Sequence, residues 1–347
     1  ENNINIILDE LIEISPQLNQ IKTRNNTYIY DFLILATGSE ISYFGHNHWK
    51  KFSPGLKNIN DSISIRAKIL KAFEKAERIK NKNGLDKLMK FVLIGGGPTG
   101  VEMAGAIAEL SKKVLTKEFT TIETRTAKII LLEAGPNILS TASHGLSIYA
   151  KKTLEKLGVE VKCNTTVQNI SEGLVKTNAE TIEAETIIWC AGVKASPVKS
   201  WINVKTDETG RVLVNEDLSI SNYSNMFVIG DGSYVKNKNG KPLPGLAPVA
   251  KQEGNFVAEV IKKNIHSGKP PKKFYYKNRG YLATIGRANA IVDFGWFTLK
   301  GRIGWIFWSI IHIYFLIGFR NRLMVFINWL WSYLTFSKGA RLITDDK

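Results

Sequence analysis

A glycine-rich turn between a buried strand and a helix constrains the fold of this chain more than any other feature. Residues 91–94 are consecutively apolar, and Gly95, Gly97 and Gly100 follow them in the spacing GxGxxG. Glycine allows a tight turn at the first position, a close approach of phosphate at the second and close packing of helix on sheet at the third. The unpaired N–H groups of the following helix attract phosphate. The pattern therefore predicts a dinucleotide site.

An acidic residue ends the next expected strand, which runs from Lys128 to Leu132. A carboxylate here, on Glu133, can accept hydrogen bonds from both hydroxyls of a ribose, and it repels a 2′-phosphate. The motif therefore favours NADH over NADPH. The interval between the glycines and this acid exceeds the usual interval of about 20 residues. The longer interval predicts an insertion from Leu115 to Thr126.

The rest of the chain alternates between strand and helix patterns. Strands are expected at 4–8, 28–35, 91–94, 128–132, 159–163, 186–192 and 225–231, and helices at 62–82, 101–115, 146–157 and 248–264. Helices that alternate with buried strands ending in small residues are typical of parallel, doubly wound sheets. The fold class is therefore α/β, and 347 residues suffice for two domains.

Cysteine and histidine usage excludes several kinds of site. Cys163 and Cys190 are the only cysteines and do not form a CxxC pair, which excludes a disulfide scaffold and disfavours a redox-active dithiol. We interpret both as reduced, buried residues. His46 and His48 form the only close histidine pair, and without further ligands they do not predict a metal site.

The C-terminal part of the chain is strongly basic. From His266 onward, thirteen Lys and Arg residues stand against three acids, so this part carries +10 of the net charge of +16. Basic residues mixed with Trp and Tyr occur on nucleic-acid-binding surfaces and in the headgroup zone of anionic membranes. The long apolar runs of the same segment favour a membrane surface and no nucleic acid.

Two apolar runs make up this C-terminal segment. Ile303–Phe319 is seventeen residues long without a charge, and Arg302 and Arg320 flank it. At ~1.5 Å per residue it would reach about 25 Å, short of the ~30 Å hydrocarbon core of a bilayer. A second run covers Leu323–Phe336. Two helices lying in one leaflet, or a thin span with an interfacial helix, both fit this pattern; a buried dimer interface is the third alternative.

Several short motifs occur in the order found in flavoproteins that bind two dinucleotides. The strand and turn from Tyr30 to Gly38 resemble the passage from the FAD domain into the NAD domain, and 188–192 resembles the return passage. Val228-Ile229-Gly230-Asp231 resembles the FAD motif whose aspartate accepts a hydrogen bond from a ribityl hydroxyl. The resemblance implies two Rossmann-like domains, with the FAD domain split around the NAD domain. It assigns Gly192 to NAD, and to FAD it assigns Ala36, Thr37, Gly38, Asp231 and Ala247.

Within that superfamily, the second half resembles the type II NADH dehydrogenases. Leu246–Gly254 is similar to their AQxAxQ quinone-site motif, and 281–287 to the strand before their C-terminal membrane segment. Residues 319–323 and 339–343 resemble their C-terminal signatures. The resemblance implies a respiratory enzyme that pumps no protons, sits on the cytoplasmic face of the cell (inner) membrane, and passes a hydride from NADH to FAD and electrons to a quinone.

The resemblance suggests catalytic roles for three residues, and each has a simpler alternative. Glu102 resembles the family glutamate near the nicotinamide and flavin, and it also suits the first turn of a helix as a partner of the helix dipole. Gln252 is similar to a quinone-binding glutamine, or it is a solvated helix residue. Arg322 corresponds to a cation near the quinone, or it anchors the chain at lipid headgroups.

The chain departs from the family pattern at two places. Pro248 stands where the family has the first glutamine of the quinone motif. The chain begins at Glu1, without a preceding FAD-binding strand and GxGxxG, so we expect an N-terminal truncation of some 70 residues or more and weak binding of FAD by this piece alone.

The resulting division of the chain has four segments. Residues 1–60 are expected to end the first FAD-binding half, 61–195 to bind NAD(H), 196–292 to form the second FAD-binding half with the quinone-site helix, and 293–347 to attach to the membrane. Two other functions fit the sequence: a different FAD- and NAD(P)H-dependent reductase with a protein acceptor, and an inactive remnant that acts only as a membrane-bound or nucleic-acid-binding protein. The sequence leaves open which quinone is used and whether the chain forms a homodimer.

Overall fold

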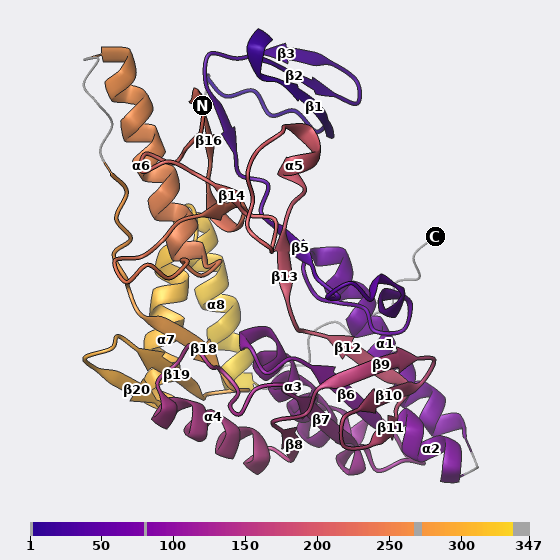
Figure 1. The fold of residues 1–347 in the computed structure, drawn as a ribbon. Helices are drawn as coiled ribbons and strands as arrows, with labels where there is room; N and C mark the ends of the chain where they lie inside the picture. The colour runs from indigo at the N-terminus through magenta and orange to yellow at the C-terminus, as the bar shows by residue number, and fades with distance from the viewer. Residues whose placement is uncertain (1–2, 80–81, 267–272, 336–347) are drawn as a thin grey trace. The chain divides into compact units, whose positions relative to one another are not determined.

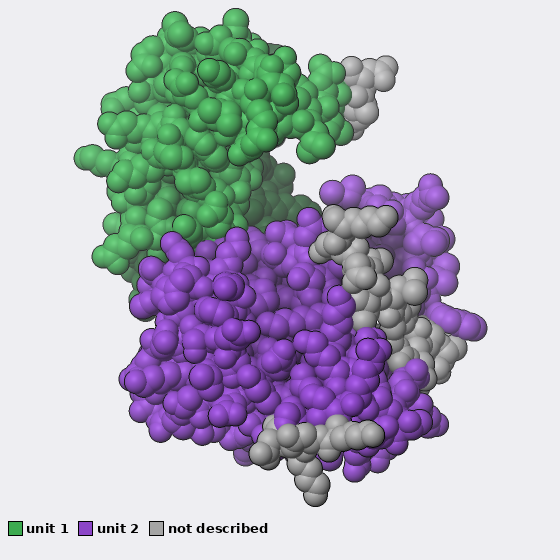
Figure 2. Space-filling view, turned by 90° about the vertical axis from the view of Figure 1, so that its right-hand side faces the viewer, with its two compact units in different colours: residues 1–40, 193–279 green, residues 41–192, 280–347 purple. Residues whose placement is uncertain are grey.

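The chain folds into two compact units, each built from two separate stretches of sequence. The structure is a computed structural model that describes residues 3–79, 82–266 and 273–335. Unit 1 comprises residues 1–40 and 193–279, and unit 2 comprises residues 41–192 and 280–347; Figure 2 shows the two units in different colours. The finer division into four segments stays a prediction.

A four-stranded parallel sheet forms the centre of unit 2 (Figure 1). Its strand order is β12-β6-β7-β8, with bounds β12 Thr186–Trp189, β6 Lys90–Ile94, β7 Lys128–Leu132 and β8 Val159–Lys162. Ile94 pairs with both Trp189 and Leu132, and Leu132 pairs with Lys162, so all four strands end at one level. β6, β7 and β12 are almost continuously apolar and buried, as parallel strands with helices on both faces require. The edge strand β8 alternates between buried and exposed residues.

Three long helices of unit 2 follow the amphipathic patterns of the sequence. α1 covers Ile59–Arg78, α3 covers Pro98–Glu109 and α4 covers His144–Lys156. The buried face of α1 is the expected one, with Ile65, Ile69, Ala72, Phe73 and Ala76 inside. α1 begins earlier than expected because Asn58 and Asp61 form a capping box. The short helix α2 covers Lys82–Leu88.

The segment in which an insertion is expected is irregular. α3 passes into a π-helical turn at Leu110–Val114 and then into 3-10 turns at Leu115–Lys117 and Thr124–Thr126. Glu77 fixes this segment, because its carboxylate accepts the backbone N–H groups of Thr120, Thr121 and Ile122 at 2.8–3.0 Å.

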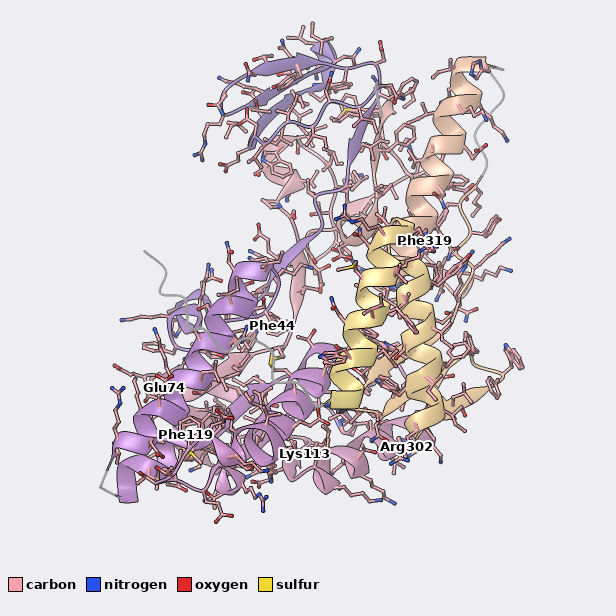
Figure 3. The ribbon with its side chains drawn as sticks, turned by 180° about the vertical axis from the view of Figure 1, so that it is seen from behind. Phe44, Glu74, Lys113, Phe119, Arg302 and Phe319 are labelled. Carbon is pink, nitrogen blue, oxygen red and sulfur yellow. The ribbon has the colours of Figure 1, made fainter. Side chains whose placement is uncertain are left out.

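Two antiparallel sheets and a helical hairpin complete unit 2. The sheets consist of β9 Val167–Ser171, β10 Leu174–Thr177 and β11 Thr181–Glu183, and of β18 Tyr281–Thr284, β19 Ala290–Asp293 and β20 Thr298–Lys300. The hairpin consists of α7, Gly301–Phe315, and α8, Phe319–Thr335. Figure 3 shows the two helices side by side, with Arg302 and Phe319 near their beginnings.

The long apolar run of the C-terminal segment does not form one helix. α7 ends at Phe315, and Leu316 is extended, so the run Ile303–Phe319 is divided between α7, a turn and the beginning of α8. Trp308 of α7 stacks on Trp329 of α8 with ring centroids 5.5 Å apart. None of the helices in the described part of the chain combines the length and apolarity needed to cross a membrane.

Unit 1 combines small sheets with one long helix. β4 Leu33–Leu35 lies parallel to β16 Tyr223–Val228, and β15 Ser219–Ile220 pairs with β16 on its other side. α6 covers Ala247–His266. The remaining elements are β1 Leu11–Ser15, β2 Gln20–Thr23, β3 Thr27–Ile29, β5 Ser39–Ile41, β13 Val193–Ala195, α5 Val198–Trp201, β14 Val212–Leu213 and β17 Ser233–Tyr234.

Two strand expectations in unit 1 need correction. The strand expected at 4–8 is wrong, because these residues are in no strand and Ile6 and Leu8 are almost fully exposed. Its alternating apolar side chains have no sheet neighbour on which to pack. The single strand expected at 28–35 is two strands, β3 and β4, in different sheets.

Candidate functional site

The glycine turn after β6 requires glycine at two positions for steric reasons. Gly95 has a φ of +110°, and a Cβ on it would lie 2.8 Å from Ala191. A Cβ on Gly100 would lie 1.8 Å from the carbonyl oxygen of Gly95. α3 can therefore pack this closely against the turn only without side chains at these positions.

Gly97 lies at the N-cap of α3 and faces open space. A Cβ on it would meet no atom within 4 Å, so the protein itself does not require glycine here. The first N–H groups of a helix lack partners within the helix and carry partial positive charge. The free space in front of α3 therefore suits a diphosphate.

Glu133 is held by the backbone at the end of β7. Its Oε2 accepts the N–H of Gly96 at 2.6 Å, and its Oε1 accepts the N–H of Gly135 at 2.7 Å. Each carboxylate oxygen can accept a further hydrogen bond. The carboxylate is thus preoriented and can still receive ribose hydroxyls.

A cavity of about 480 Å³ opens beside these groups, all within unit 2. Four residues predicted for the NAD site line it: Gly95, Gly97, Glu133 and Gly192. Gly100, the fifth residue predicted for the NAD site, does not line the cavity; it packs against the backbone of Gly95. The cavity lies at the carboxyl ends of β6, β7 and β12, where open α/β sheets bind ligands.

An aromatic wall, which the sequence analysis missed, forms part of the same cavity: Phe44, His46, Trp49 and Trp189. His46 stacks on Trp49 at 4.2 Å between ring centroids, and Trp49 lies 5.6 Å from Trp189. Phe44, labelled in Figure 3, lies close to Gly192. A Cβ on Gly192 would lie 2.4 Å from the ring of Phe44. Five ring side chains between residues 43 and 49 were the available signal.

The two cysteines are free, and each is partly exposed rather than fully buried as expected. Cys190 lines the cavity. Desolvation raises the pKa of its thiol to about 12, so the thiol is protonated at neutral pH and is a poor nucleophile.

Glu102 lies on α3 and binds the sheet of β18. Its Oε1 accepts the backbone N–H of Thr284 at 3.2 Å and the hydroxyl of Thr284 at 3.1 Å. Desolvation raises the pKa of Glu102, against the two hydrogen bonds and the charge of His312, which lower it. A carboxyl group with a raised pKa can exchange protons closer to neutral pH than an ordinary glutamate.

Gln252 and Arg322 both have local partners. The side-chain amide of Gln252 bonds Lys277 twice, accepting its N–H and donating to its carbonyl oxygen, both at 2.9 Å. Arg322 donates from Nε to the carbonyl oxygen of Leu316 at 2.9 Å, and its guanidinium lies 5.6 Å from the ring centroid of Tyr314. The roles suggested for both residues stay predictions.

The residues predicted for FAD form a connected group in unit 1. Ala36 and Thr37 are exposed, and a Cβ on Gly38 would meet no atom within 4 Å. Ser39 donates its hydroxyl to Oδ2 of Asp231 at 2.6 Å. Ala247 begins α6, two residues after Gly245, whose Cβ would lie 3.0 Å from Oδ1 of Asp231. The accessible backbone at 36–38 and the oriented carboxylate of Asp231 could hydrogen-bond a cofactor that carries several hydroxyl groups.

Comparison with known proteins identifies two family domains. Residues 1–254 match the pyridine nucleotide-disulphide oxidoreductase family, and residues 278–336 match the NDH2 C-terminal domain. The chain is 36% identical to the type II NADH:quinone oxidoreductase Ndh of Mycobacterium tuberculosis, over 100% of this chain and 77% of that protein. It is 31% identical to the type II NADH:quinone oxidoreductase of Staphylococcus haemolyticus, over 84% of this chain and 72% of that protein.

A solved structure supports the fold. The NDH2 of Plasmodium falciparum in complex with NADH superposes with a TM-score of 0.86, at 21% identity, over 97% of this chain and 85% of that chain. The α/β fold class predicted from the sequence is therefore confirmed.

Proposed function

Because the chain belongs to the family of type II NADH:quinone oxidoreductases, we propose that it is an FAD-dependent NADH dehydrogenase that reduces a membrane quinone. The balanced reaction is NADH + H⁺ + quinone → NAD⁺ + quinol. The hydride of NADH supplies two electrons and one proton, and the second proton comes from the medium. This respiratory reaction involves no proton pumping.

The observation that carries this proposal is the cavity beside the glycine turn. The N-terminus of α3, the carboxylate of Glu133 and the backbone of Gly192 meet there. In the proposal, the N–H groups of α3 bind the diphosphate, and Glu133 binds the ribose hydroxyls and repels a 2′-phosphate. The aromatic wall excludes water and offers faces on which a planar ring can stack.

The FAD residues contribute position rather than chemistry. When bound, FAD supplies the group that accepts a hydride and releases electrons. Asp231 is proposed to accept a hydrogen bond from a ribityl hydroxyl, since Ser39 fixes its orientation. The open backbone at Ala36, Thr37 and Gly38, and the beginning of α6 at Ala247, are proposed to line the same cofactor.

Quinone reduction requires a proton as well as electrons. Glu102 is proposed to hold that proton, since its pKa is raised and its carboxylate keeps an unused oxygen. Gln252 and Arg322 are proposed to bind the quinone. Their present partners leave each of them further donors, because an amide carries two N–H groups and a guanidinium five.

The helical hairpin is proposed to attach the protein to lipid. Large apolar side chains are exposed along the hairpin. They are Ile303, Ile306, Ile310 and Tyr314 on α7, Ile317 in the turn, and Phe319, Phe326, Ile327 and Leu330 on α8. Arg302 and Arg320 stand at the helix beginnings and suit anionic headgroups. Because NADH is formed inside the cell, we place the protein on the cytoplasmic face of the cell (inner) membrane. A second copy of the chain is the alternative partner for this face.

The test is NADH oxidation by protein made from the complete gene, with residues 1–347 assayed beside it. We expect a yellow protein whose flavin absorbance is bleached by NADH and restored by a soluble quinone. If NADH bleaches the flavin but only a protein acceptor restores it, the chain is the other kind of FAD-dependent reductase. A colourless protein without affinity for NADH would overturn the proposal.

A further inference from the structure

Glu253 is exceptional among the described residues, because no other Asp, Glu, Lys, Arg or His in that part of the chain is buried. It lies in the middle of the buried stripe of α6, which otherwise consists of Val249, Val257 and Val260. A carboxyl group in such a stripe is costly unless it is hydrogen-bonded. Its contacts therefore indicate what it stabilises.

The contacts of Glu253 converge on one turn. Its Oε2 accepts the backbone N–H of Gly230 at 2.5 Å, and the hydroxyl of Ser233 lies 3.2 Å from both carboxyl oxygens. Gly230 and Ser233 are the two ends of the turn after β16, and Asp231 lies between them. Gly230 has a φ of +71°, which glycine adopts without strain, so the sharp turn there depends on glycine.

Burial, and to a smaller extent Asp231 on the same turn, favour the protonated form of the Glu253 carboxyl. Desolvation, and to a smaller extent the nearby carboxylate of Asp231, raise the pKa of Glu253 to about 7, against the hydrogen bonds from Gly230 and Ser233, which lower it. Asp231, on the turn, is the ionisable group that acts on Glu253; Ser39 donates a hydrogen bond to Asp231 from the other side.

We propose that Glu253 is a positioning residue for FAD: its carboxyl holds Gly230 and Ser233, and thereby fixes the orientation of Asp231 toward the cofactor. The inference rests on the proposed role of Asp231. It differs from a purely structural role of Glu253 in core packing, which would affect stability without a specific effect on FAD. Glu253 needs no contact with FAD, because it acts through the turn.

Three variants of the protein made from the complete gene separate these roles. Glu253→Gln keeps an oxygen for the N–H of Gly230 and offers an N–H to Ser233, but it cannot ionise. Glu253→Leu has a side chain of similar size but loses the hydrogen bonds with Gly230 and Ser233. Val257→Ala, the matched control, removes buried methyl groups one turn along the same stripe without touching the turn. The measurements are the FAD dissociation constant, from flavin fluorescence, and Tm at pH 5 and pH 8.

We expect Glu253→Gln to bind FAD within about threefold of the wild type and Glu253→Leu to bind it at least tenfold more weakly. Val257→Ala should lower Tm but leave FAD affinity within threefold. A carboxyl whose pKa is raised in the folded state binds its proton more tightly there, so its contribution to stability is lost as the pH rises from its ordinary value toward about 7. Glu253→Gln should therefore show a smaller fall in Tm between pH 5 and pH 8 than the wild type.

Either of two results would overturn the inference: a folded Glu253→Leu with the FAD affinity of the wild type, or an equal loss of FAD in Val257→Ala. If Glu253→Leu does not fold, Ser233→Ala replaces it, and unchanged FAD affinity in that variant counts against the inference. NADH affinity, measured in parallel, should be unchanged in every variant because the cavity belongs to unit 2. A wild type without NADH affinity would contradict the proposed function instead.

Discussion

Glu133 combines a structural role with a proposed selective role in one carboxylate. Its two oxygens accept the N–H groups of Gly96 and Gly135, and it lines the cavity. Glu133→Gln keeps one acceptor oxygen and removes the charge that repels a 2′-phosphate. We expect the ratio of kcat/KM for NADH to that for NADPH to fall about tenfold, which corresponds to ~1.4 kcal/mol. Steady-state kinetics with both coenzymes measures this ratio.

A matched control lies on the next strand. Glu160 of β8 is an exposed glutamate paired with Lys162, and it is absent from the cavity lining. Glu160→Gln removes the same charge from the same sheet and should leave the coenzyme ratio unchanged. An unchanged ratio in Glu133→Gln would remove the selective role of that residue.

The proposed proton role of Glu102 predicts a difference between two electron acceptors. Quinone takes up protons when it is reduced, whereas ferricyanide takes up only electrons. Glu102→Gln should lower kcat with quinone about tenfold and leave kcat with ferricyanide within twofold. Because the pKa of Glu102 is raised, its proton is lost at higher pH than that of an ordinary glutamate. The wild-type rate with quinone should therefore fall as the pH rises through that pKa, and the fall should be absent in the variant.

Glu109 supplies the comparison for this experiment. It lies on the same helix, desolvation also raises its pKa, and its carboxylate accepts the N–H of Arg287 at 2.6 Å. Glu109→Gln should change neither the ratio of kcat with quinone to kcat with ferricyanide nor the pH profile of the rate with quinone. Equal losses with both acceptors in Glu102→Gln would indicate a structural residue rather than a proton carrier.

At the scale of elements, two glycines at the beginning of α3 differ in what they are expected to support: Gly100 the fold, and Gly97 the binding of NADH. Gly100 has no room for a Cβ, since one would lie 1.8 Å from a backbone oxygen, whereas Gly97 faces open space. Gly100→Ala should therefore lower Tm by several degrees or prevent folding. Gly97→Ala should keep the wild-type Tm and raise KM for NADH at least tenfold, because its methyl group occupies the space proposed for the diphosphate. Thermal melts and NADH kinetics on both variants test this; a normal KM in Gly97→Ala would contradict the phosphate site.

The elements that sequence predicts well are those whose own side chains determine them. α1 and β6 carry continuous helical or buried-strand patterns, and their buried faces were predicted correctly. The 4–8 segment has a strand pattern but no partner, and pairing is a property of two segments rather than one. The aromatic wall was missed for the same reason, since Trp49 and Trp189 meet only after the chain folds. Glu253 was detectable, because a charge interrupts an apolar stripe of α6.

At the scale of the whole molecule, the net charge of +16 and the exposed apolar side chains of the hairpin both fit the proposed attachment to an anionic membrane. The break between α7 and α8 was not predicted, because Ile303–Phe319 contains no charge or proline. The signal at the break is Gly318, whose φ is +81°. Two helices of moderate length can bury apolar side chains in the outer part of one leaflet, with their basic ends among the headgroups.

Membrane attachment through this hairpin predicts a specific loss. Ile306 and Ile310 lie one turn apart on α7, with 52% and 62% of their surfaces exposed. The double variant Ile306→Glu, Ile310→Glu should bind vesicles containing anionic lipid at least tenfold more weakly, because burying each Ile contributes ~1.5–3 kcal/mol and a carboxylate adds a cost. Oxidation of NADH with a soluble quinone should continue. Co-sedimentation with vesicles and the soluble assay measure the two effects.

The control and the rival partner are tested in the same experiment. Ile63, an exposed residue of α1 in the same unit, becomes Ile63→Glu and should bind vesicles like the wild type. If the apolar face instead joins two copies of the chain, the wild type should sediment as a dimer without lipid and the double variant as a monomer, with equal vesicle binding by both. Headgroup attraction is screened by salt, with a Debye length of about 3 Å at 1 M against about 10 Å at 0.1 M, whereas apolar burial depends little on salt. Wild-type binding should therefore weaken but persist in 1 M salt. Complete release by salt would show that the basic residues alone, and not the hairpin, hold the protein at the membrane.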